Sequence, residues 1–342
     1  TVGKSLFVKE IDEPMITNQR VATIKICHGL LPEYINYIIL SSIIQNIIRI
    51  SKNSTNDNIS MDTIKRFPIP LPPLEEQKRI AAKIEELMPY VDKYDVAYSE
   101  VEKLNKKFPE DMQKSILQYA IQGKLAEQRE EDGTAEELYK QIQAEKEKLI
   151  REGKIKKSNP LPEITADEIP FEIPENWKWV RLGEVATKIT DGSHNPPPKR
   201  SNGYYVISAK NVKSGKIIFD NVDRYTDEEG FQKENSRTNI KRGDIIMGII
   251  GGSIGNIATY NHDEKVIAQR SISIIDTLAS NEYIKTVLQS PFIQYQLKNT
   301  SSTAQGGVYL GTINELLIPL PPLAEQKRIV ERIEELLPYT KQ

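Results

Sequence analysis

The sequence predicts an α+β protein built from a duplicated unit, in which each copy of a mixed α/β domain leads into a long helix. The first observation is a repeat: IPLPPLEEQKRI at 69–80 returns as IPLPPLAEQKRI at 318–329 with a single change. The second is a run of apolar residues after the first repeat at steps of three and four, as in a coiled coil. The third is a series of short β-type runs after Trp177, separated by glycine-containing turns.

The composition sets the broad class of the protein. Hydrophobic residues make up 38% and charged residues 27% of the 342 residues. No apolar run reaches the roughly 18–20 residues of a membrane-spanning helix, so we expect a cytoplasmic protein without membrane contact. The single cysteine, Cys27, excludes an internal disulfide and a cysteine-based metal site, and we expect it to be a small buried residue.

Charge is unevenly distributed along the chain. The net charge is only −2, but residues 178–216 carry eight Lys/Arg against two acidic residues, a local net of +6. Residues 74–152 carry 14 basic against 19 acidic residues, a local net of −5. The basic segment is suited to nucleic-acid phosphates and the acidic segment to protein contacts.

The repeat extends over residues 1–74, which align with roughly 253–323. PEYINYIILSSIIQ at 32–45 matches NEYIKTVLQSPFIQ at 281–294, and ISMDTIKRFPIPLPP matches VYLGTINELLIPLPP. About 80 residues before the second copy, 171–252, have no counterpart before the first. A period near 250 residues exceeds that of a solenoid repeat, so it indicates a duplicated domain-plus-helix unit.

The segment after the first repeat, 74–125, is predicted to form one long helix. Apolar residues recur along it at coiled-coil spacing, and Gly123 is expected to end it. Pro89 and Pro109 are positions at which the helix is expected to kink or be interrupted. The prolines before the helix hold the chain extended and so set the direction in which it begins.

Residues 126–170 are predicted to contain a charged helix and a linker. Thr134 and Glu137 fit a capping box, so a helix is expected to begin there and to end near Gly153. Its many charges favour a solvated surface helix. SNPLPEITADEIPFEIPENW is then expected to be an extended linker.

Residues 171–322 are predicted to form a complete mixed α/β domain. Strands are expected in YYVISA, KIIFD, DIIMGII, NIATY and SISIIDT, with a tight turn at Gly251 and Gly252. Residues 281–297 are expected to be helical, and 323–342 repeats the start of the long helix.

Three motifs suggest enzyme chemistry and lack the residues it requires. Asn-Pro-Pro at 195–197 is similar to an adenine methyltransferase motif, but proline follows it in place of an aromatic residue, and no glycine-rich cofactor loop accompanies it. Val-Gly-Lys-Ser at 2–5 looks like the end of a phosphate-binding loop, yet its repeat reads IGNI. His28, His194 and His262 lack metal-ligand spacing. We therefore expect no catalytic residue, no metal and no cofactor.

Taken in order, these features resemble the DNA-specificity subunit of type I restriction-modification systems. The resemblance is carried by the duplicated junction, AIQGKL at 120–125, IPENWKWVRLGEV at 173–185 and ITDGSHNPPPK at 189–199. It covers nearly the whole chain. It implies two mixed α/β target-recognition domains joined by long antiparallel coiled-coil helices, with an internal pseudo-twofold repeat.

The resemblance divides the chain into five parts. They are the C-terminal half of a first target-recognition domain (1–73), a long central spacer helix (74–125), a charged helix and linker (126–170), a complete second target-recognition domain (171–322) and the start of a second spacer helix (323–342). The chain departs from the family pattern because the first domain lacks its front half.

The resemblance also implies a non-catalytic role. Each domain would read one half of a bipartite site in double-stranded DNA, and the helices would set the spacer between the halves. The implied partners are two adenine N6-methyltransferase subunits and the ATP-dependent restriction subunits.

Within the complete domain, we expect loops to read the DNA because they carry the donors and acceptors that groove edges and phosphates require. These residues are Asp191, Ser193, His194, Lys199, Arg200, Lys210, Asn211, Ser253, Gln269 and Arg270. Replacing Lys199 and Arg200 by alanine should weaken DNA binding and flatten its salt dependence.

The repeated junction is expected to dock the two methyltransferase subunits, because two similar domains around a pseudo-twofold axis present equivalent surfaces. The expected docking residues are Pro72, Pro73, Glu76, Gln77, Arg79, Pro321, Pro322, Glu325, Gln326 and Arg328.

Three other functions are considered. One is a coiled-coil scaffold whose domains bind protein, and another is a shortened specificity subunit that self-associates through its helices as a homodimer. A self-contained modification enzyme is disfavoured by the missing cofactor loop.

Overall fold

The computed structural model describes residues 2–10, 16–18, 20–51, 58–213, 215–220, 222, 224–300 and 306–341. The chain divides into two compact units, Thr1–Asn105 and Lys106–Gln342. The boundary between unit 1 and unit 2 falls inside one long helix, α4 (Leu74–Ile121).

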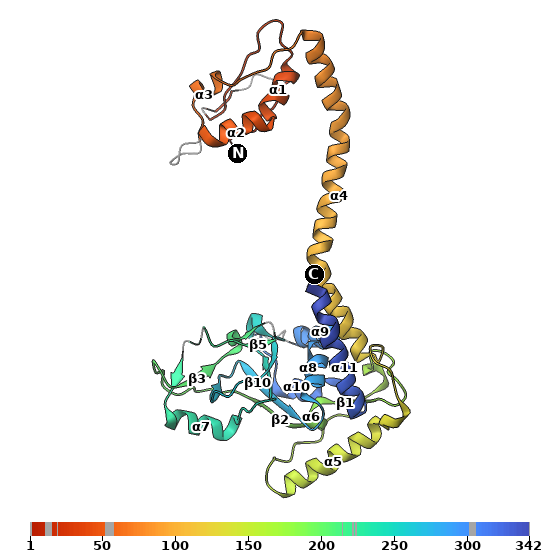
Figure 1. Ribbon diagram of the computed structural model, residues 1–342. Helices are drawn as coiled ribbons and strands as arrows, with labels where there is room; N and C mark the ends of the chain where they lie inside the picture. The colour runs from red at the N-terminus through yellow and green to blue at the C-terminus, as the bar shows by residue number, and fades with distance from the viewer. Residues whose placement is uncertain are drawn as a thin grey trace. The chain divides into compact units, whose positions relative to one another are not determined.

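Unit 1 contains helices and no strand in its described residues (Figure 1). Its short helices are α1 (Pro32–Leu40), α2 (Ser42–Ser51) and α3 (Met61–Lys65), and they are followed by the first part of α4. Proline opens α1, where its fixed φ suits the helix and its missing N–H is not needed. α1 and α2 contact each other, and the buried apolar residues of unit 1 are Tyr34, Ile35, Ile44, Ile48 and Ala81.

Cys27 is exposed, so the expectation of a buried thiol is wrong. It lies in a segment of unit 1 without helix or strand, and residues 21–25 just before it are exposed as well. No described helix therefore covers this part of the chain.

α4 is a single helix of 48 residues that runs through both Pro89 and Pro109. The expected interruption is therefore absent. Gly123 follows the end of the helix with φ +70°, and Lys124 donates to the carbonyl of Tyr119 at 3.0 Å. Glycine reaches this left-handed conformation without strain, so the expected stop is confirmed.

The apolar seam of α4 is exposed over much of its length in the described chain. The side chains that share this exposure are Val91, Tyr94, Tyr98, Val101, Leu104 and Phe108, each between 54% and 69% exposed. At the end of the helix the environment changes: Ile116, Ala120 and Ile121 are buried in the core of unit 2.

The charged helix is α5 (Ala135–Arg151), and its capping box of Thr134 and Glu137 is present as predicted. It is not wholly solvated. Tyr139 donates to the Glu184 carboxylate at 2.8 Å, and Lys146 donates to the Gly183 carbonyl at 2.7 Å. Burial lowers the pKa of Lys146. One face of α5 is thus packed on the domain, through these polar contacts and through the apolar side chains of Leu138 and Ile142 in the main core.

The main sheet of unit 2 has four antiparallel strands in the order β2-β10-β7-β8. They are β2 (Ala186–Asp191), β10 (Ile272–Thr277), β7 (Ile245–Gly248) and β8 (Ile257–Thr259). A second sheet has the order β6-β3-β9 and comprises β6 (Tyr225–Thr226), β3 (Tyr204–Ile207) and β9 (Val266–Ala268), with β3 and β9 parallel.

Two strand pairs complete the sheet structure of unit 2. β1 (Lys178–Arg181) pairs with β11 (Leu317–Leu320), and β4 (Val212–Lys213) pairs with β5 (Lys216–Ile217). Each of the five predicted β runs contains a strand. The turn expected at Gly251 is the 3-10 segment η4 (Gly251–Ser253), between β7 and β8.

Helices surround these sheets (Figure 1). They are α6 (Leu182–Val185), α7 (Glu228–Thr238), α8 (Asn281–Gln289), α9 (Pro291–Thr300), α10 (Leu310–Glu315) and α11 (Leu323–Leu336), with further 3-10 turns at Glu130–Asp132, Ala166–Glu168, Ala209–Asn211 and Leu337–Lys341. The helical stretch expected at 281–297 is therefore two helices, divided at Ser290 before Pro291.

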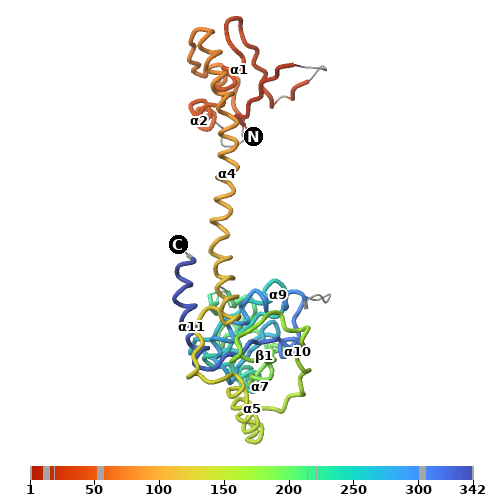
Figure 2. The backbone as a smooth tube through the Cα atoms, turned by 90° about the vertical axis from the view of Figure 1, so that its right-hand side faces the viewer, coloured from red at the N-terminus to blue at the C-terminus, as the bar shows by residue number. Residues whose placement is uncertain are grey.

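α11 runs antiparallel to the end of α4 (Figure 2). Gln113 donates to the Thr340 hydroxyl at 3.1 Å, and Gln128 donates to the Glu325 carboxylate at 3.0 Å. Residue 113 thus lies beside residue 340 and residue 128 beside residue 325, so the two segments run in opposite directions. Ile329 of α11 lies in the same buried cluster as the end of α4. The expected antiparallel pairing is confirmed over this stretch.

The two copies of the repeat share hydrogen bonds as well as sequence. Gln77 accepts from the Leu31 N–H at 2.9 Å and donates to the Pro72 carbonyl at 2.9 Å. Gln326 makes the same two bonds, also at 2.9 Å each, with the residues 249 positions later in the sequence. Both glutamines are buried, so these hydrogen bonds hold the first turn of α4 and of α11 against the backbone of its own domain.

A tyrosine makes a second repeated bond. Tyr34 donates to the Pro70 carbonyl at 2.8 Å, and Tyr283 donates to the Pro319 carbonyl at 2.7 Å. Burial raises the pKa of both phenols, which therefore remain protonated donors at neutral pH. The proline-rich lead-in is thus held at equivalent atoms in both copies.

A glycine and a glutamine form the third repeated contact. Gln45 donates to the Gly3 carbonyl at 2.8 Å, and Gln294 donates to the Gly255 carbonyl at 3.0 Å. Both glycines have positive φ, and a Cβ atom on either would lie less than 3.0 Å from the glutamine side chain. Glycine is therefore required at both positions, and the internal repeat is present at the level of individual atoms.

Candidate nucleic-acid interface

Loops from four parts of unit 2 meet at one edge of its sheets. β2 ends there, and the next residues contact the turn between β9 and β10: Ser193 donates its N–H to the Ala268 carbonyl at 2.7 Å, and Arg270 donates to the Ser193 carbonyl at 3.0 Å. Gly192 donates to the Ile272 carbonyl at 3.1 Å. We call residues 191–194, 208–211, 249–253 and 269–271 the loop edge.

The other two segments of the loop edge contact the same turn. The N–H of Ala209 donates to the Ser271 hydroxyl at 3.1 Å, which brings the turn after β3 to this point. The N–H of Ile249 donates to the Ser271 carbonyl at 3.0 Å, which brings in the turn after β7. Four loops that are distant in sequence thus form one surface around residues 269–271.

Gly192 makes the closest approach in this surface. A Cβ atom at this position would lie 2.2 Å from the carbonyl oxygen of Gln269, a distance that no side chain tolerates. The parallel bridge between Ser193 and Gln269 lies next to it. Any larger residue at position 192 would separate the two loops.

A charged cluster occupies one end of the loop edge. The Asp191 carboxylate lies 2.5 Å from the imidazole Nε2 of His194 and accepts from the guanidinium of Arg237 at 3.1 Å. Arg237 also donates to the Gly192 carbonyl at 2.6 Å. The His194 side chain is 63% exposed, so the cluster presents its imidazole to solvent.

Arg237 belongs to this cluster, although the sequence did not identify it as a candidate site residue. It comes from the last turn of α7, about 45 residues from the loop it supports. A basic residue in the last turn of a helix also complements the helix dipole, so its identity alone gave no signal of a second role.

Most of the predicted DNA-contacting residues lie together at the loop edge, but they differ in exposure. His194, Lys210 and Arg270 are exposed, while Asp191, Ser253 and Gln269 are partly buried. Ser193 and Asn211 are buried, at 2% and 3% exposure.

Asn211 uses its side chain inside the domain. Its Oδ1 accepts from the Ser208 N–H at 2.9 Å, and its Nδ2 donates to the Ile218 carbonyl at 3.0 Å. Both polar atoms therefore hold the turn between β3 and β5. The amide serves the fold and presents no free atom to solvent.

Lys199 and Arg200 belong to a different neighbourhood. Arg200 donates its N–H to the Tyr225 carbonyl at 3.0 Å, and its guanidinium pairs with the Asp227 carboxylate at 2.8 Å. Those partners belong to β6 and the start of α7, and not to the loop edge. Lys199 is exposed beside this pair.

The predicted docking residues differ in exposure between the two copies. In unit 1, Pro73, Glu76 and Arg79 are exposed and Pro72 is partly buried, while Gln77 is buried. In unit 2, Pro321, Pro322, Glu325 and Gln326 are all buried, and Arg328 is partly buried. The buried residues hold their own domain together.

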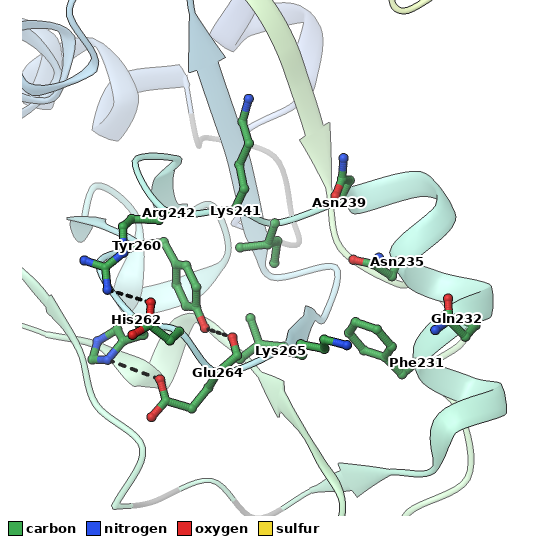
Figure 3. A pocket seen from close by; sticks show the side chains of 13 residues that line it. Phe231, Gln232, Asn235, Asn239, Lys241, Arg242, Tyr260, His262, Glu264 and Lys265 are labelled. Atoms are coloured by element: carbon green, nitrogen blue, oxygen red, sulfur yellow. Dashed lines mark hydrogen bonds and ion pairs between the residues drawn. The ribbon is translucent and has the colours of Figure 1, made fainter.

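An open cavity of about 410 Å³ lies between α7 and the β8–β9 turn, away from the predicted residues (Figure 3). Two pairs of its lining groups contact each other: Arg242 with Asp263 at 2.8 Å, and His262 with Glu264 at 3.7 Å. The Lys265 ammonium lies 6.0 Å from the centre of the Phe231 ring. This pairing leaves the cavity without a concentrated charge of either sign.

No group of three or more His, Cys, Asp or Glu side chains is placed to hold a metal ion in the part of the chain that the structure describes. Within the same residues, no helix is both long and apolar enough to cross a membrane.

Comparison with known proteins places both copies of the repeat in one family. The family model of the type I restriction modification DNA specificity domain matches residues 1–91 and 174–340. The type I restriction enzyme EcoAI specificity subunit from Escherichia coli is 25% identical over 88% of this chain and 59% of its own length. The EcoEI specificity subunit, also from Escherichia coli, is 33% identical over 65% of this chain and 38% of its own length.

Among solved structures, the HsdS subunit from Thermoanaerobacter tengcongensis aligns with a TM-score of 0.45 and 21% identity, over 92% of this chain and 65% of that one. The chain thus spans less than two thirds of the length of these relatives. Because the family model matches well over half of the chain and both copies of its repeat, the chain belongs to the type I restriction modification DNA specificity domain family.

Proposed function

We propose that this chain is the DNA-recognition subunit of a type I restriction-modification complex and is itself not an enzyme. The observation that carries the proposal is the match of the family model to both copies of the repeat. Each copy ends in a helix whose first turn is held by an equivalent buried glutamine, Gln77 or Gln326. Its named relatives are specificity subunits of restriction enzymes.

The loop edge is the proposed DNA-reading surface of the complete domain, 171–322. Lys210 and Arg270 are exposed, and among the described residues no ion pair is formed by either, so both are available to phosphates or guanine edges. Gln269 and His194 add groups that can discriminate bases. Ser193 and Asn211 support the loops from inside.

The remaining features are assigned to assembly. Residues 1–73 would be part of a second reading domain, and the helices at 74–125 and 323–342 would set the spacer between two half-sites. The two junctions are the proposed docking region for adenine methyltransferase subunits, with the ATP-dependent restriction subunits joining that complex. The buried glutamines would hold the backbone of each junction in a fixed conformation for docking.

Selection from a randomised DNA duplex tests the proposal. The chain is purified with an adenine methyltransferase subunit of the same type of system, and bound duplexes are sequenced. We expect enrichment of a specified sequence block that a Lys210→Ala, Arg270→Ala variant no longer selects. A protein-binding scaffold would enrich no sequence, and this result would exclude the proposed function.

A further inference from the structure

A hairpin formed by β4 and β5 extends from the loop edge of unit 2. The two strands form a sheet of their own, in which Val212 lies opposite Ile217 and Lys213 lies opposite Lys216. Val212 and Ile217 are buried in an apolar cluster of the domain, whereas both lysines are exposed. Residues directly opposite each other point to the same face of a strand pair, so the hairpin presents two ammonium groups together on its outer face.

Two asparagines fix the base of this hairpin. Ile218 donates its N–H to the Asn211 carbonyl at 2.8 Å, and the Asn211 Nδ2 donates to the Ile218 carbonyl at 3.0 Å, so the pairing continues one residue beyond the strands. The side chain of Asn256, which lies between η4 and β8, donates to the Val212 carbonyl at 3.2 Å. The hairpin is thus attached at two of the four loops of the loop edge.

The two lysines of the hairpin face each other without a counter-charge. The Cβ atoms of directly opposite residues lie about 4.5–5.5 Å apart, and like charges at this spacing destabilise a strand pair. Among the described residues, no carboxylate forms an ion pair with Lys213, Lys216 or the neighbouring Lys210. Residues 192–219 contain no acidic residue. The fold therefore keeps a pair that costs stability and that no described ion pair neutralises.

Charged residues on short exposed strands also have a protective use, because they prevent the strands from pairing with another molecule. A charge of either sign serves that purpose. A lysine opposite a glutamate would serve it and would stabilise the hairpin as well. Protection of the strand edges therefore explains a charge at each position but not two charges of the same sign. The shared positive sign points to a polyanionic partner.

We propose that this hairpin binds the DNA backbone, with Lys213 and Lys216 on phosphates next to the bases that the loop edge reads. The inference rests on the DNA-recognition function proposed above, and it adds two residues to the candidates at the loop edge. An ammonium group binds a phosphate as a point charge, and such contacts fix the register of a protein on the duplex without reading its sequence. The hairpin positions the duplex, and the loop edge reads it.

Charge reversal at one lysine separates phosphate binding from protection of the strand edges. Lys213→Glu places opposite charges across the hairpin, so the midpoint of denaturant unfolding should stay the same or rise. DNA binding should nevertheless weaken, because the glutamate removes one phosphate contact and pairs with Lys216, which removes the other.

The salt dependence of DNA binding measures the loss. The full chain is purified with an adenine methyltransferase subunit of a type I system and titrated on one duplex. Between 50 and 200 mM salt, the affinity of the Lys213→Glu complex should fall about tenfold less than that of the parent complex, because two phosphate contacts are missing. Lys156→Glu, the same charge change at an exposed position of the linker, is the matched control and should behave as the parent does.

Selection from a randomised duplex shows whether the hairpin contacts phosphates or bases. Lys213→Ala with Lys216→Ala should lower the affinity for every duplex to the same extent and leave the enriched sequence block unchanged. This outcome differs from that of Lys210→Ala with Arg270→Ala, which should lose the block. If one position of the block became degenerate in the hairpin variant, the lysines would be reading a base, and the assignment to the backbone would be wrong.

The two proposals fail in different ways. A parent complex that selects a sequence block, together with a Lys213→Glu complex of unchanged affinity and salt dependence, would remove the hairpin from the interface and leave the proposed function in place. A parent complex that selects no block, but whose salt dependence Lys213→Glu weakens, would keep the hairpin contact and exclude sequence recognition. A parent complex that binds no duplex would contradict both.

Discussion

At the scale of single residues, the repeated Glu-Gln-Lys-Arg of the two junctions has two kinds of role. The glutamine binds the backbone of its own domain in both copies. In unit 2 the glutamate accepts from the indole of Trp177, just before β1, and the arginine pairs with Asp132 in the turn after α4. Sequence alone identified these residues as important but assigned all of them to an external partner, because identity between copies does not reveal which side of a helix is buried.

Removal of the repeated glutamine should destabilise each unit locally. Gln77→Ala and Gln326→Ala each leave a buried N–H and a carbonyl without a partner, which should cost about 1–3 kcal/mol. Hydrogen exchange should show faster opening near residue 31 in the first variant and near residue 280 in the second. Lys78→Ala and Lys327→Ala, at exposed neighbouring positions, are the controls. If neither glutamine variant alters exchange, these bonds do not hold the junctions.

The ion pair of Asp132 and Arg328 should make the stability of unit 2 depend on pH. Hydrogen bonding to Arg328 lowers the pKa of Asp132 below its usual value of about 3.9. A lowered folded-state pKa stabilises the folded form above the unfolded-state pKa, and this contribution is lost as the pH falls from about 4 through the folded-state pKa.

Denaturant unfolding of Asp132→Asn at several pH values measures this contribution. The variant should be less stable than the parent chain at pH 6, and the difference should shrink below pH 4. Asp220→Asn, at an exposed turn, serves as the control. A difference that is constant with pH would show that the carboxylate charge is not involved.

Two exposed cations of the loop edge should determine the salt dependence of DNA binding. Each phosphate contact contributes about 0.9 to the slope of log affinity against log salt, so Lys210→Ala with Arg270→Ala should flatten the slope by about two. Lys156→Ala with Lys157→Ala removes the same charge from the linker and should leave the slope unchanged. The same titration on Lys199→Ala with Arg200→Ala shows whether their separate neighbourhood also contacts DNA.

At the scale of elements, periodicity predicted most of the secondary structure and little of its packing. Runs of β-branched residues gave the five strands, and the capping box at Thr134 gave the start of α5. The packing of α5 was missed because its many charges outweighed a short apolar pattern, Ala135, Leu138 and Ile142, which is buried against the core of unit 2. The parallel pairing of β3 and β9 joins strands about 60 residues apart, which local patterns do not specify.

The sequence identified most of the candidate residues that lie at the loop edge, but it did not predict how their loops are arranged. Polar residues in glycine-rich loops identified Asp191, His194 and Arg270. That the four loops converge on residues 269–271 depends on strand order, and Arg237 reaches the edge from a helix. Burial of Asn211 likewise follows from the tertiary fold.

The prolines of α4 give an element-scale prediction. Pro109 lies inside the helix, where it lacks the N–H that would bond the carbonyl four residues before it. Pro109→Ala should slow amide exchange in residues 105–112, by an amount equivalent to at most about 3 kcal/mol. Lys103→Ala should have little effect on the same amides. Unchanged exchange in the proline variant would indicate that the helix is not continuous there.

At the scale of the whole molecule, the repeat was the strongest signal in the sequence. Two stretches 249 positions apart share a proline-rich lead-in, a buried glutamine and a helix start, and the family model matches both. What the sequence could not predict is the difference between the copies in packing. That difference arises because 174–182 and the turn after α4 cover the junction of unit 2.

The central claim is that this chain chooses the DNA sequence on which a type I system acts. The most direct measurement is to express the chain with an adenine methyltransferase subunit of a type I system in a host free of other adenine methylation, and to map every methylated adenine. We predict methylation confined to one specific motif and relaxed or lost in the Lys210→Ala, Arg270→Ala variant. Methylation that follows no motif, or a motif that is unchanged when the chain is omitted, would contradict the claim.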